Sequence, residues 1–292
     1  MKRFVRHALA WLVLASGPVM GAEEGQFADF GSGIRIHYID RGKGAAIVLL
    51  HGGTSALESW VRTGVVDNLA KDYRVIAFDA RGAGKSSKPH DPKQYGRQQA
   101  LDVPRLLDYL KIDRAHIIGF SLGGSTVAQL LTLHPERFLT AVQVAAAGRS
   151  PEAANDPRIE IEAAEIEKGC ISRSRLYRQA PPNAKPTEEE YRQREAQCRA
   201  DANFDQHSVA ASLRGYKDQA VTLEQMKAIK VPTLGIVGTL DHTLKEMQEL
   251  KKFRPDMKFI LLEGVSHTGK TGIQGQPQLV AEIRTFLAEQ RK

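Results

Sequence analysis

Gly119-Phe120-Ser121-Leu122-Gly123 lies where a short apolar run, 115–118, gives way to a stretch of helical composition, 122–133. A serine between two glycines at such a strand-to-helix turn is typical of a nucleophile elbow. The turn strains the serine backbone, and a side chain at either glycine would collide with the neighbouring strand or helix. A plain turn rich in glycine and serine is the alternative. The elbow predicts a serine hydroxyl at the end of a sheet, above a helix N-terminus that favours negative charge.

Strand-like and helix-like stretches alternate on both sides of this turn. The segment 27–38 is expected to form an antiparallel hairpin, with its turn at 31–33. Short apolar runs then predict buried strands at 46–50, 74–79, 115–120 and 141–146. Between them lie helix-length stretches at 56–71, 98–110 and 122–133. Such alternation is typical of an α/β fold in which helices cover both faces of a mostly parallel sheet.

A charged, proline-containing segment from about 149 to 215 interrupts the alternation. Its composition is helical, and it contains no apolar strand-like run. After it come a strand at 232–237, a helix at 244–252, a strand at 257–262 and a last helix at 278–290. A flexible excursion is one interpretation, but unstructured loops of this length are unusual in compact domains. We therefore expect one α/β domain over 23–292 that carries an ordered helical cap at about 149–215.

The N-terminus has the pattern of a targeting segment. Basic residues precede an apolar run at 8–20, which ends at the small residues Gly21 and Ala22. This is the arrangement of a secretory signal peptide over 1–22. A membrane anchor is the alternative, but the apolar run is too short to span a bilayer. We expect export to the periplasm or the medium, with no stable membrane span in the mature chain.

Charge and cysteine content limit the partners and the compartment. The formal net charge is +7, from 41 Lys and Arg against 34 Asp and Glu, without a basic cluster interleaved with aromatic residues. This balance disfavours a nucleic-acid partner. In an oxidising compartment, a disulfide between Cys170 and Cys198 would stabilise the fold by about 3–4 kcal/mol in the chain-entropy model. Two unreactive free thiols are the alternative.

A nucleophilic serine needs a base that accepts its proton and a carboxylate that orients the base. Asp241 and His267 each follow one of the last two predicted strands. The chain order Ser121, Asp241, His267 is the order that accompanies this elbow. The structural alternatives are that Asp241 only caps a helix and that His267 is a solvated loop residue. His242 directly follows the predicted acid, which makes it a poor base.

Together these residues resemble the α/β-hydrolase fold superfamily, in its serine-nucleophile, esterase-like branch with a helical cap. The likeness extends from about Phe27 to the end of the chain. His51-Gly52-Gly53 is similar to the oxyanion loop of the family, and 79–86 resembles the family's next loop. The resemblance implies an oxyanion hole formed by the backbone N–H groups of Gly53 and Leu122.

The type of nucleophile limits the reaction that the resemblance implies. Dehalogenase-like and epoxide-hydrolase-like members carry an aspartate at the elbow, whereas this chain carries Ser121. A serine indicates an acyl-enzyme and an ester, lactone, thioester or amide substrate. Gly53-Thr54 departs from the proline-glycine of prolyl-aminopeptidase-like relatives, which weakens a peptidase interpretation. A lactonase and a cofactor-free haloperoxidase or perhydrolase stay open, as does a non-catalytic protein that binds a small ligand on this fold.

The expected partner is a small-molecule acyl substrate. We predict carboxylic-ester hydrolysis, with Thr54 and Phe120 as substrate contacts. The sequence contains neither a nucleotide-binding glycine loop nor metal-ligand spacing. It therefore predicts no cofactor and no metal ion, and it leaves the oligomeric state open.

Overall fold

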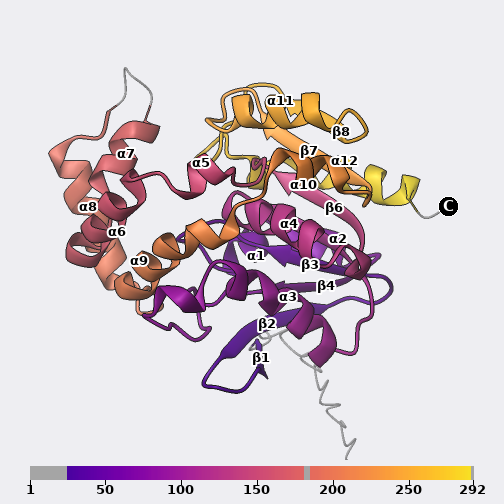
Figure 1. The fold of residues 1–292 in the computed structure, drawn as a ribbon, viewed down its shortest axis with the longest axis horizontal. Helices are drawn as coiled ribbons and strands as arrows, with labels where there is room; N and C mark the ends of the chain where they lie inside the picture. The colour runs from indigo at the N-terminus through magenta and orange to yellow at the C-terminus, as the bar shows by residue number, and fades with distance from the viewer. Residues whose placement is uncertain (1–24, 181–184, 291–292) are drawn as a thin grey trace, which may run out of the picture.

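The computed structural model describes residues 25–180 and 185–290, so the predicted signal peptide at 1–22 lies outside the described residues. An eight-stranded sheet forms the centre, in the order β1-β2-β4-β3-β5-β6-β7-β8 (Figure 1). β2 pairs antiparallel with β1 and β4, and the other neighbours are parallel. The strands span Gln26–Asp29 (β1), Arg35–Arg41 (β2), Ala46–Leu50 (β3), Arg74–Phe78 (β4), Ala115–Phe120 (β5), Phe138–Val144 (β6), Thr233–Gly238 (β7) and Lys258–Leu262 (β8).

Helices cover both faces of the sheet, as the sequence predicts. Alternate residues of a strand point to opposite faces. In β3, Ile47 and Leu49 pack into one hydrophobic core and Val48 into the other. Full burial of such a side chain stabilises the fold by about 1.5–3 kcal/mol. One face is covered by α1 (Glu58–Arg62), α2 (Val65–Leu69) and α12 (Pro277–Glu289). The other is covered by α3 (Arg97–Tyr109), α4 (Leu122–Leu133), α10 (Leu223–Ala228) and α11 (Leu244–Phe253).

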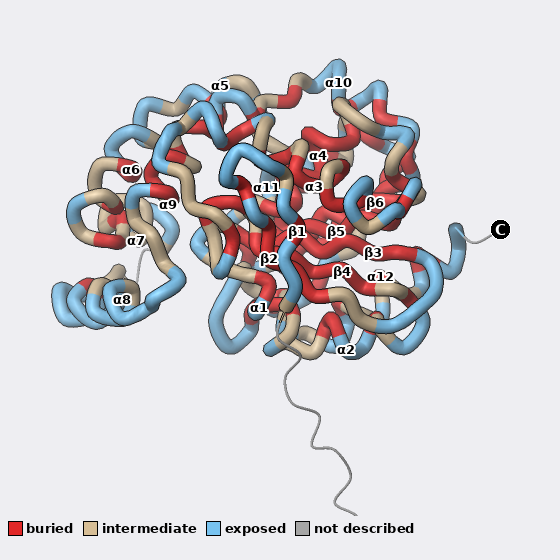
Figure 2. The backbone as a smooth tube through the Cα atoms, turned by 90° about the horizontal axis from the view of Figure 1, so that it is seen from below, coloured by how far each residue is buried: buried red, intermediate tan, exposed pale blue. Residues whose placement is uncertain are grey.

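Figure 2 shows the result of this layering, with the inner strands forming a buried centre and exposed residues gathered on the edge strand β1 and on the outer helices and loops. The predicted α/β architecture is confirmed. No helix within 25–180 and 185–290 is long and apolar enough to cross a bilayer.

Two predicted element boundaries differ from the structure for local backbone reasons. The helix expected at 56–71 is divided into α1 and α2, because Gly64 between them has φ +73°. The strand expected at 141–146 is β6, which begins earlier, at Phe138, and ends at Val144. It ends there because Ala145 has φ +52°, a left-handed conformation that turns the chain out of the sheet.

A helical layer lies between β6 and β7 in the chain and extends from one end of the sheet (Figure 1). It contains α5 (Pro151–Ala154), α6 (Arg158–Gly169), α7 (Arg173–Gln179), α8 (Glu188–Ala200) and α9 (Gln206–Arg214). Outside this layer, short 3-10 turns span Pro92–Gln94, Pro135–Arg137, Gly215–Gln219 and Ile273–Gly275. The layer, which we call the cap, has a small hydrophobic core of its own between α6 and α9.

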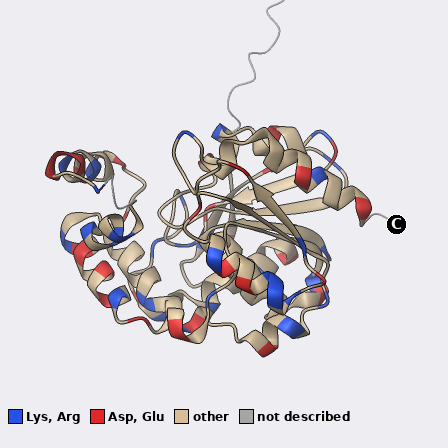
Figure 3. Ribbon diagram, turned by 90° about the horizontal axis from the view of Figure 1, so that it is seen from above, with Lys and Arg blue, Asp and Glu red and all other residues tan. Residues whose placement is uncertain are grey.

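The cap is an insertion whose two ends lie together. The backbone N–H of Val221 donates to the carbonyl oxygen of Arg149 at 2.8 Å, so the chain leaves and returns at one place. A disulfide joins Cys170, at the end of α6, to Cys198 in α8. Ser208 of α9 donates to the carbonyl oxygen of Gly82 at 3.0 Å and so fastens the cap to a loop of the sheet domain. Acidic and basic segments lie side by side along the cap helices (Figure 3).

Candidate active site

Ser121 occupies the tight turn between β5 and α4, where its backbone has φ +52° and ψ −118°. Such a conformation costs a residue with a side chain about 1–3 kcal/mol, so its surroundings must hold it in place. A Cβ at Gly119 would lie 2.3 Å from the carbonyl oxygen of Gly123. A Cβ at Gly123 would lie 2.3 Å from the carbonyl oxygen of Leu50 in β3. Both separations are too short for real atoms, so the predicted requirement for two glycines is confirmed.

Three side chains from separate strand ends meet beside this turn. Ser121 Oγ lies 2.9 Å from Nε2 of His267. Nδ1 of His267 lies 2.9 and 3.0 Å from the two carboxylate oxygens of Asp241. The three residues follow β5, β8 and β7, whose C-terminal ends share one edge of the sheet because the strands run parallel. The structure therefore brings together the serine, histidine and aspartate that the sequence singles out.

Asp241 is the buried end of this chain of hydrogen bonds. Its side chain is fully buried, and that of His267 is 16% exposed. Burial raises the pKa of Asp241, but hydrogen bonds from His267 and from the N–H and hydroxyl of Thr243 outweigh it and hold the pKa below its ordinary value. The ionised carboxylate accepts a hydrogen bond from Nδ1–H, which leaves Nε2 available to accept the hydroxyl proton of Ser121. Asp241 thus both holds the turn at Thr243 through its side chain and contacts the ring of His267.

Gly53 and Leu122, the predicted oxyanion donors, lie against each other. A Cβ at Gly53 would be 3.6 Å from Cδ2 of Leu122. Among the described residues, no protein acceptor is assigned to either backbone N–H, and Leu122 is the first residue of α4. His51 anchors this loop, since its Nδ1 donates to the carbonyl oxygen of Gly52 at 2.7 Å and its Nε2 accepts from the N–H of Ala80 at 3.0 Å. Burial lowers the pKa of His51, which favours the neutral ring that this pair of contacts requires.

A single carboxylate, Asp79 at the end of β4, fastens the loops around the site. It accepts hydrogen bonds from Nδ1 of His37 at 2.7 Å and from the N–H groups of Leu57 and Lys85 at 2.8 and 2.9 Å. Gly84 passes so close that a Cβ there would lie 2.2 Å from the Asp79 carboxyl group. The loop after β3 and the loop after β4 are therefore held to one buried anion.

A cavity of about 740 Å³ lies between these loops and the cap. Its wall includes Gly53 and Leu122 from the sheet domain, and Arg175 and Tyr216 from the segment that carries the cap. Ser121 is not itself among the lining residues, but Leu122, which directly follows it, is. The cavity therefore ends beside the elbow and gives the site space for a small molecule.

Tyr216 is a residue of this wall that sequence reasoning missed. Its hydroxyl lies 3.9 Å from the position of a Cβ at Gly53, and no hydrogen bond is assigned to it within the described part of the chain. The guanidinium of Arg149 packs 3.8 Å from the centroid of its ring. No motif marks Tyr216 or Arg175, and their only sequence signal is that Arg175 belongs to the charged segment at about 149–215 and Tyr216 directly follows it.

Thr54 and Phe120, the predicted substrate contacts, occupy different surroundings. Thr54 lines the cavity, and its hydroxyl donates to the carbonyl oxygen of Gly53 at 2.7 Å. Phe120 is buried, is not among the lining residues, and lies with its ring centroid 4.9 Å from that of His267. It also packs edge-on against the buried Trp60 at 6.4 Å, so it supports the histidine ring from the core. Direct contact of either residue with a substrate stays a prediction.

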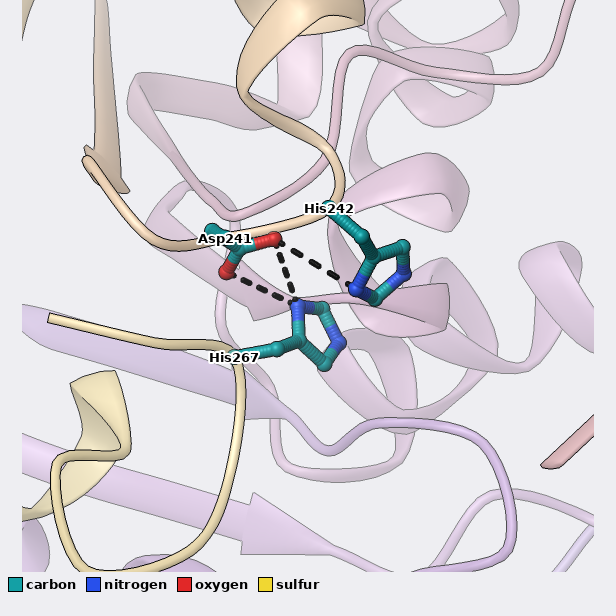
Figure 4. A group of neighbouring side chains, drawn as sticks. All are labelled: Asp241, His242 and His267. Carbon is teal, nitrogen blue, oxygen red and sulfur yellow. Dashed lines mark hydrogen bonds and ion pairs between the residues drawn. The ribbon is translucent and has the colours of Figure 1, made fainter. Parts of the chain in front are cut away.

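One group of side chains near the elbow could hold a metal ion. Asp241, His242 and His267 each offer one ligand atom, and these atoms lie within 4.8 Å of one another (Figure 4). Sequence reasoning considered His242 only as a base. Its possible role as a ligand depends on His267, which comes from a different strand end.

The sequence and the fold are similar to those of known proteins. A family model described as alpha/beta hydrolase fold matches residues 45–167. The 2-hydroxy-6-oxo-6-phenylhexa-2,4-dienoate hydrolase of Burkholderia cepacia is 37% identical over 108 residues, which are 36% of this chain and 38% of that protein. The dihydrolipoyllysine-residue acetyltransferase component of the acetoin cleaving system of Cupriavidus necator is 39% identical over 127 residues, which are 42% of this chain and 32% of that protein. The matches thus cover less than half the length of these curated relatives.

Similarity in three dimensions extends over most of the chain. The enol-lactonase of Burkholderia xenovorans LB400 has a TM-score of 0.69 and 25% identity, over 90% of this chain and 100% of that one. Its fold, the family match and the sheet topology agree with the elbow, the oxyanion loop and the order of the strand-end residues. The chain has the α/β-hydrolase fold, and its residues 45–167 match the model of the family with that fold.

Proposed function

We propose that the protein is a serine hydrolase that cleaves a carboxylic ester, or a related acyl substrate, through an acyl-enzyme. The observation that carries this proposal is the continuous hydrogen-bonded path from Ser121 Oγ to His267 Nε2, and from His267 Nδ1 to Asp241. A protein that only binds a ligand has no need for this path. The cavity of about 740 Å³ beside Leu122 supplies room for the substrate.

In the proposed first step, Ser121 Oγ attacks the substrate carbonyl carbon while His267 Nε2 takes the hydroxyl proton. The negative charge that develops on the carbonyl oxygen is stabilised by the N–H groups of Gly53 and Leu122. In sites of this kind, losing one such donor costs about 2.7–4 kcal/mol of transition-state stabilisation. His267 then gives its proton to the departing alkoxide, and the alcohol leaves.

In the second step, water replaces the alcohol. His267 Nε2 accepts a proton from the water as its oxygen attacks the acyl carbon, and then returns a proton to Ser121 Oγ. The carboxylic acid leaves and the enzyme is restored. Asp241 accepts a hydrogen bond from Nδ1–H of the histidine throughout, which keeps the ring oriented and stabilises its positively charged form.

Lactone hydrolysis, or cleavage of a keto acid, is the second candidate function. The relative from Burkholderia cepacia is named for a 2-hydroxy-6-oxo-dienoate, and the structural neighbour from Burkholderia xenovorans for an enol-lactone. Arg175 in the cavity wall supports an acidic substrate of this kind, since its guanidinium makes only a long contact with Glu162, at 3.9 Å, and can pair with a substrate carboxylate. A haloperoxidase or perhydrolase activity shares the same triad and is an outcome of the tests rather than the proposal.

Labelling and turnover test the proposal together. The protein is treated with a fluorophosphonate and assayed with p-nitrophenyl esters of graded chain length, alongside lactones. We expect labelling at Ser121, and loss of both labelling and turnover in Ser121→Ala. Ser125→Ala is the matched control, because it makes the same change one turn later in α4 and should retain both signals. Full turnover by Ser121→Ala would refute the nucleophile, and a parent protein that is neither labelled nor active would favour the non-catalytic ligand-binding alternative.

We further propose that the protein is exported. The signal-peptide pattern at 1–22 supports this, and so does the pairing of Cys170 with Cys198, because disulfides persist in oxidising compartments. Expression of the full chain in a Gram-negative host, followed by N-terminal sequencing of the periplasmic and medium fractions, tests it. A mature N-terminus at Ala22 or Glu23 is expected, and an uncleaved chain confined to the cytoplasm would refute export.

A further inference from the structure

His242 places a second imidazole beside the buried carboxylate of the proposed triad. Its Nδ1 lies 3.7 Å from Asp241 Oδ1, and its ring centroid is 4.4 Å from that of His267. Figure 4 shows both rings on the same side of the Asp241 carboxylate, one from the loop after β7 and the other from the loop after β8. The proposed reaction gives His242 no role.

The donor set and its spacing match what a small transition-metal ion requires. Two imidazole nitrogens and one carboxylate oxygen are typical ligands of Zn²⁺, which is bound at about 2.0–2.2 Å with tetrahedral angles. Ligand atoms of such an ion therefore lie about 3.3–3.5 Å from one another. The spacings from Asp241 Oδ1, 3.0 Å to His267 Nδ1 and 3.7 Å to His242 Nδ1, lie on either side of that range. All three ligand atoms lie within 4.8 Å of one another, so rotation of the side chains about their own bonds would bring them to one ion.

The group of Asp241, His242 and His267 is open to solvent on the side of His242, and charged residues lie near it. The His242 side chain is 42% exposed, whereas Asp241 is fully buried behind it. An incoming ion would therefore meet His242 first and would find the anionic ligand already desolvated. Glu246 of α11 adds negative charge near His242, and Arg175 of the cap adds positive charge that opposes it. The ligands themselves supply one net negative charge, and water would complete the coordination.

We propose that Asp241, His242 and His267 form an inhibitory site for a divalent transition-metal ion of the Zn²⁺ class. The effect on the triad rests on the proposed function, whereas metal binding itself does not. Coordination through Nδ1 of His267 uses the lone pair of that nitrogen, so the single proton of the neutral ring must lie on Nε2. Nε2 then donates toward Ser121 Oγ instead of accepting its proton. The ion thereby removes the base without displacing the serine.

Zinc titration of the protein without a polyhistidine tag tests this proposal. ZnSO₄ is added to chelator-free protein, and binding is followed by calorimetry, inhibition by ester turnover and access to Ser121 by fluorophosphonate labelling. We expect binding at one site per chain, loss of turnover and labelling, and full recovery with EDTA. Mg²⁺ at the same concentrations should have no effect, because it prefers oxygen ligands in octahedral geometry.

Two single-histidine variants separate this site from general binding to surface histidines. His242→Ala removes a proposed ligand, and each variant is compared with its own activity in the absence of metal. The zinc concentration for half-inhibition should rise at least about tenfold in His242→Ala, since even partners outside the ligand shell change metal affinity 10–100-fold. His90→Ala is the matched control, because His90 also lies beside a carboxylate (Asp205) and a second imidazole (His207), but these three do not form a group that could hold a metal ion in the described part of the chain. It should be inhibited like the parent.

The outcomes distinguish this inference from the proposed function. Equal zinc sensitivity of the parent and His242→Ala would overturn the site, even if the esterase activity is present. Zinc binding that His242→Ala abolishes, in a protein without detectable ester turnover or labelling, would support the site and refute the proposed function. Calorimetry without a bound ion at millimolar ZnSO₄ would overturn the inference outright.

Discussion

Replacing Asp241 by asparagine puts an NH₂ group in the place of one carboxylate oxygen inside a buried chain of hydrogen bonds. The hydrogen-bond partners of the two oxygens determine which oxygen is replaced. Oδ1 accepts from both the N–H and the hydroxyl of Thr243, each at 2.8 Å. The amide oxygen of asparagine must stay there, because an NH₂ group facing two donors would be unfavourable. The NH₂ group therefore takes the place of Oδ2, which lies 2.9 Å from Nδ1 of His267.

A donor in that position reverses the polarity of the histidine. Oδ1 also lies 3.0 Å from Nδ1, but it already accepts two hydrogen bonds from Thr243, so we expect Nδ1 to accept from the NH₂ group. The ring proton then lies on Nε2 and faces Ser121 Oγ, which is 2.9 Å away. The ring can no longer take the hydroxyl proton. In a Ser-His-Asp triad the same substitution lowers kcat by about 10⁴-fold while the geometry is retained. At about 1.4 kcal/mol for each factor of ten, this is about 5.5 kcal/mol of transition-state stabilisation.

Steady-state kinetics on a p-nitrophenyl ester measure the effect, with thermal unfolding as a test of folding. We expect kcat to fall by about three to four orders of magnitude, with little change in KM, because the lost interaction acts mainly in the transition state. Asp72→Asn is the matched control, since it removes an exposed carboxylate paired with Arg284 on the outer face of the fold. A folded Asp241→Asn enzyme within about tenfold of the parent kcat would refute the proposed orientation of the histidine.

Further predictions concern the cavity wall, the cap and acid stability. Tyr216→Phe should lower kcat/KM by about tenfold without changing the melting temperature, because it removes one hydroxyl beside the oxyanion loop, and unchanged kinetics would exclude that contact. Replacing both Cys170 and Cys198 by serine opens a loop with a sequence separation of 28 and should destabilise the cap by about 3.6 kcal/mol in the chain-entropy model, measured by urea unfolding and by hydrogen exchange in α8; a loss below about 1 kcal/mol would contradict it. Burial raises the pKa of Asp79, but the hydrogen bonds that it accepts lower it further, so the net pKa is below its ordinary value. This ionised carboxylate stabilises the fold above its unfolded pKa of about 3.9, and that part is lost as pH falls through the lower folded value. The stability difference between the parent and Asp79→Asn should therefore shrink below about pH 4 in urea titrations, and a difference that is constant from pH 7 to pH 3 would contradict the assignment.

The elbow and its partners can be predicted from the sequence because topology does most of the positioning. Parallel strands place their C-terminal ends at one edge, so residues that follow three such strands meet even when they are far apart in the chain. Ser121, Asp241 and His267 meet for this reason. The glycines at 119 and 123 are also predictable from the motif, because a Cβ at either position would lie only 2.3 Å from a backbone carbonyl oxygen.

The cavity wall cannot be predicted in this way. Tyr216 and Arg175 reach the site through the path of the cap, which depends on how α6 and α9 pack and on contacts such as that of Ser208 with Gly82. None of these contacts has a fixed spacing in the sequence. The division of the expected helix at Gly64 has a similar origin, because only the tertiary fold shows that this glycine adopts a positive φ.

The position of His242 next to Asp241 argues against a role as the catalytic base, but it does not reveal the proposed role as a metal ligand. Its adjacency to Asp241 makes it a poor base, since the carboxylate already receives Nδ1 of His267 at 2.9 Å and cannot orient a second ring. The same adjacency keeps an imidazole nitrogen 3.7 Å from that carboxylate, which is unfavourable for proton transfer but suits an ion that both could bind. The third ligand comes from the loop after β8, so the site exists only once the sheet has placed two strand ends together. In the proposed site, susceptibility to metal ions therefore depends on the residue next to the proposed acid.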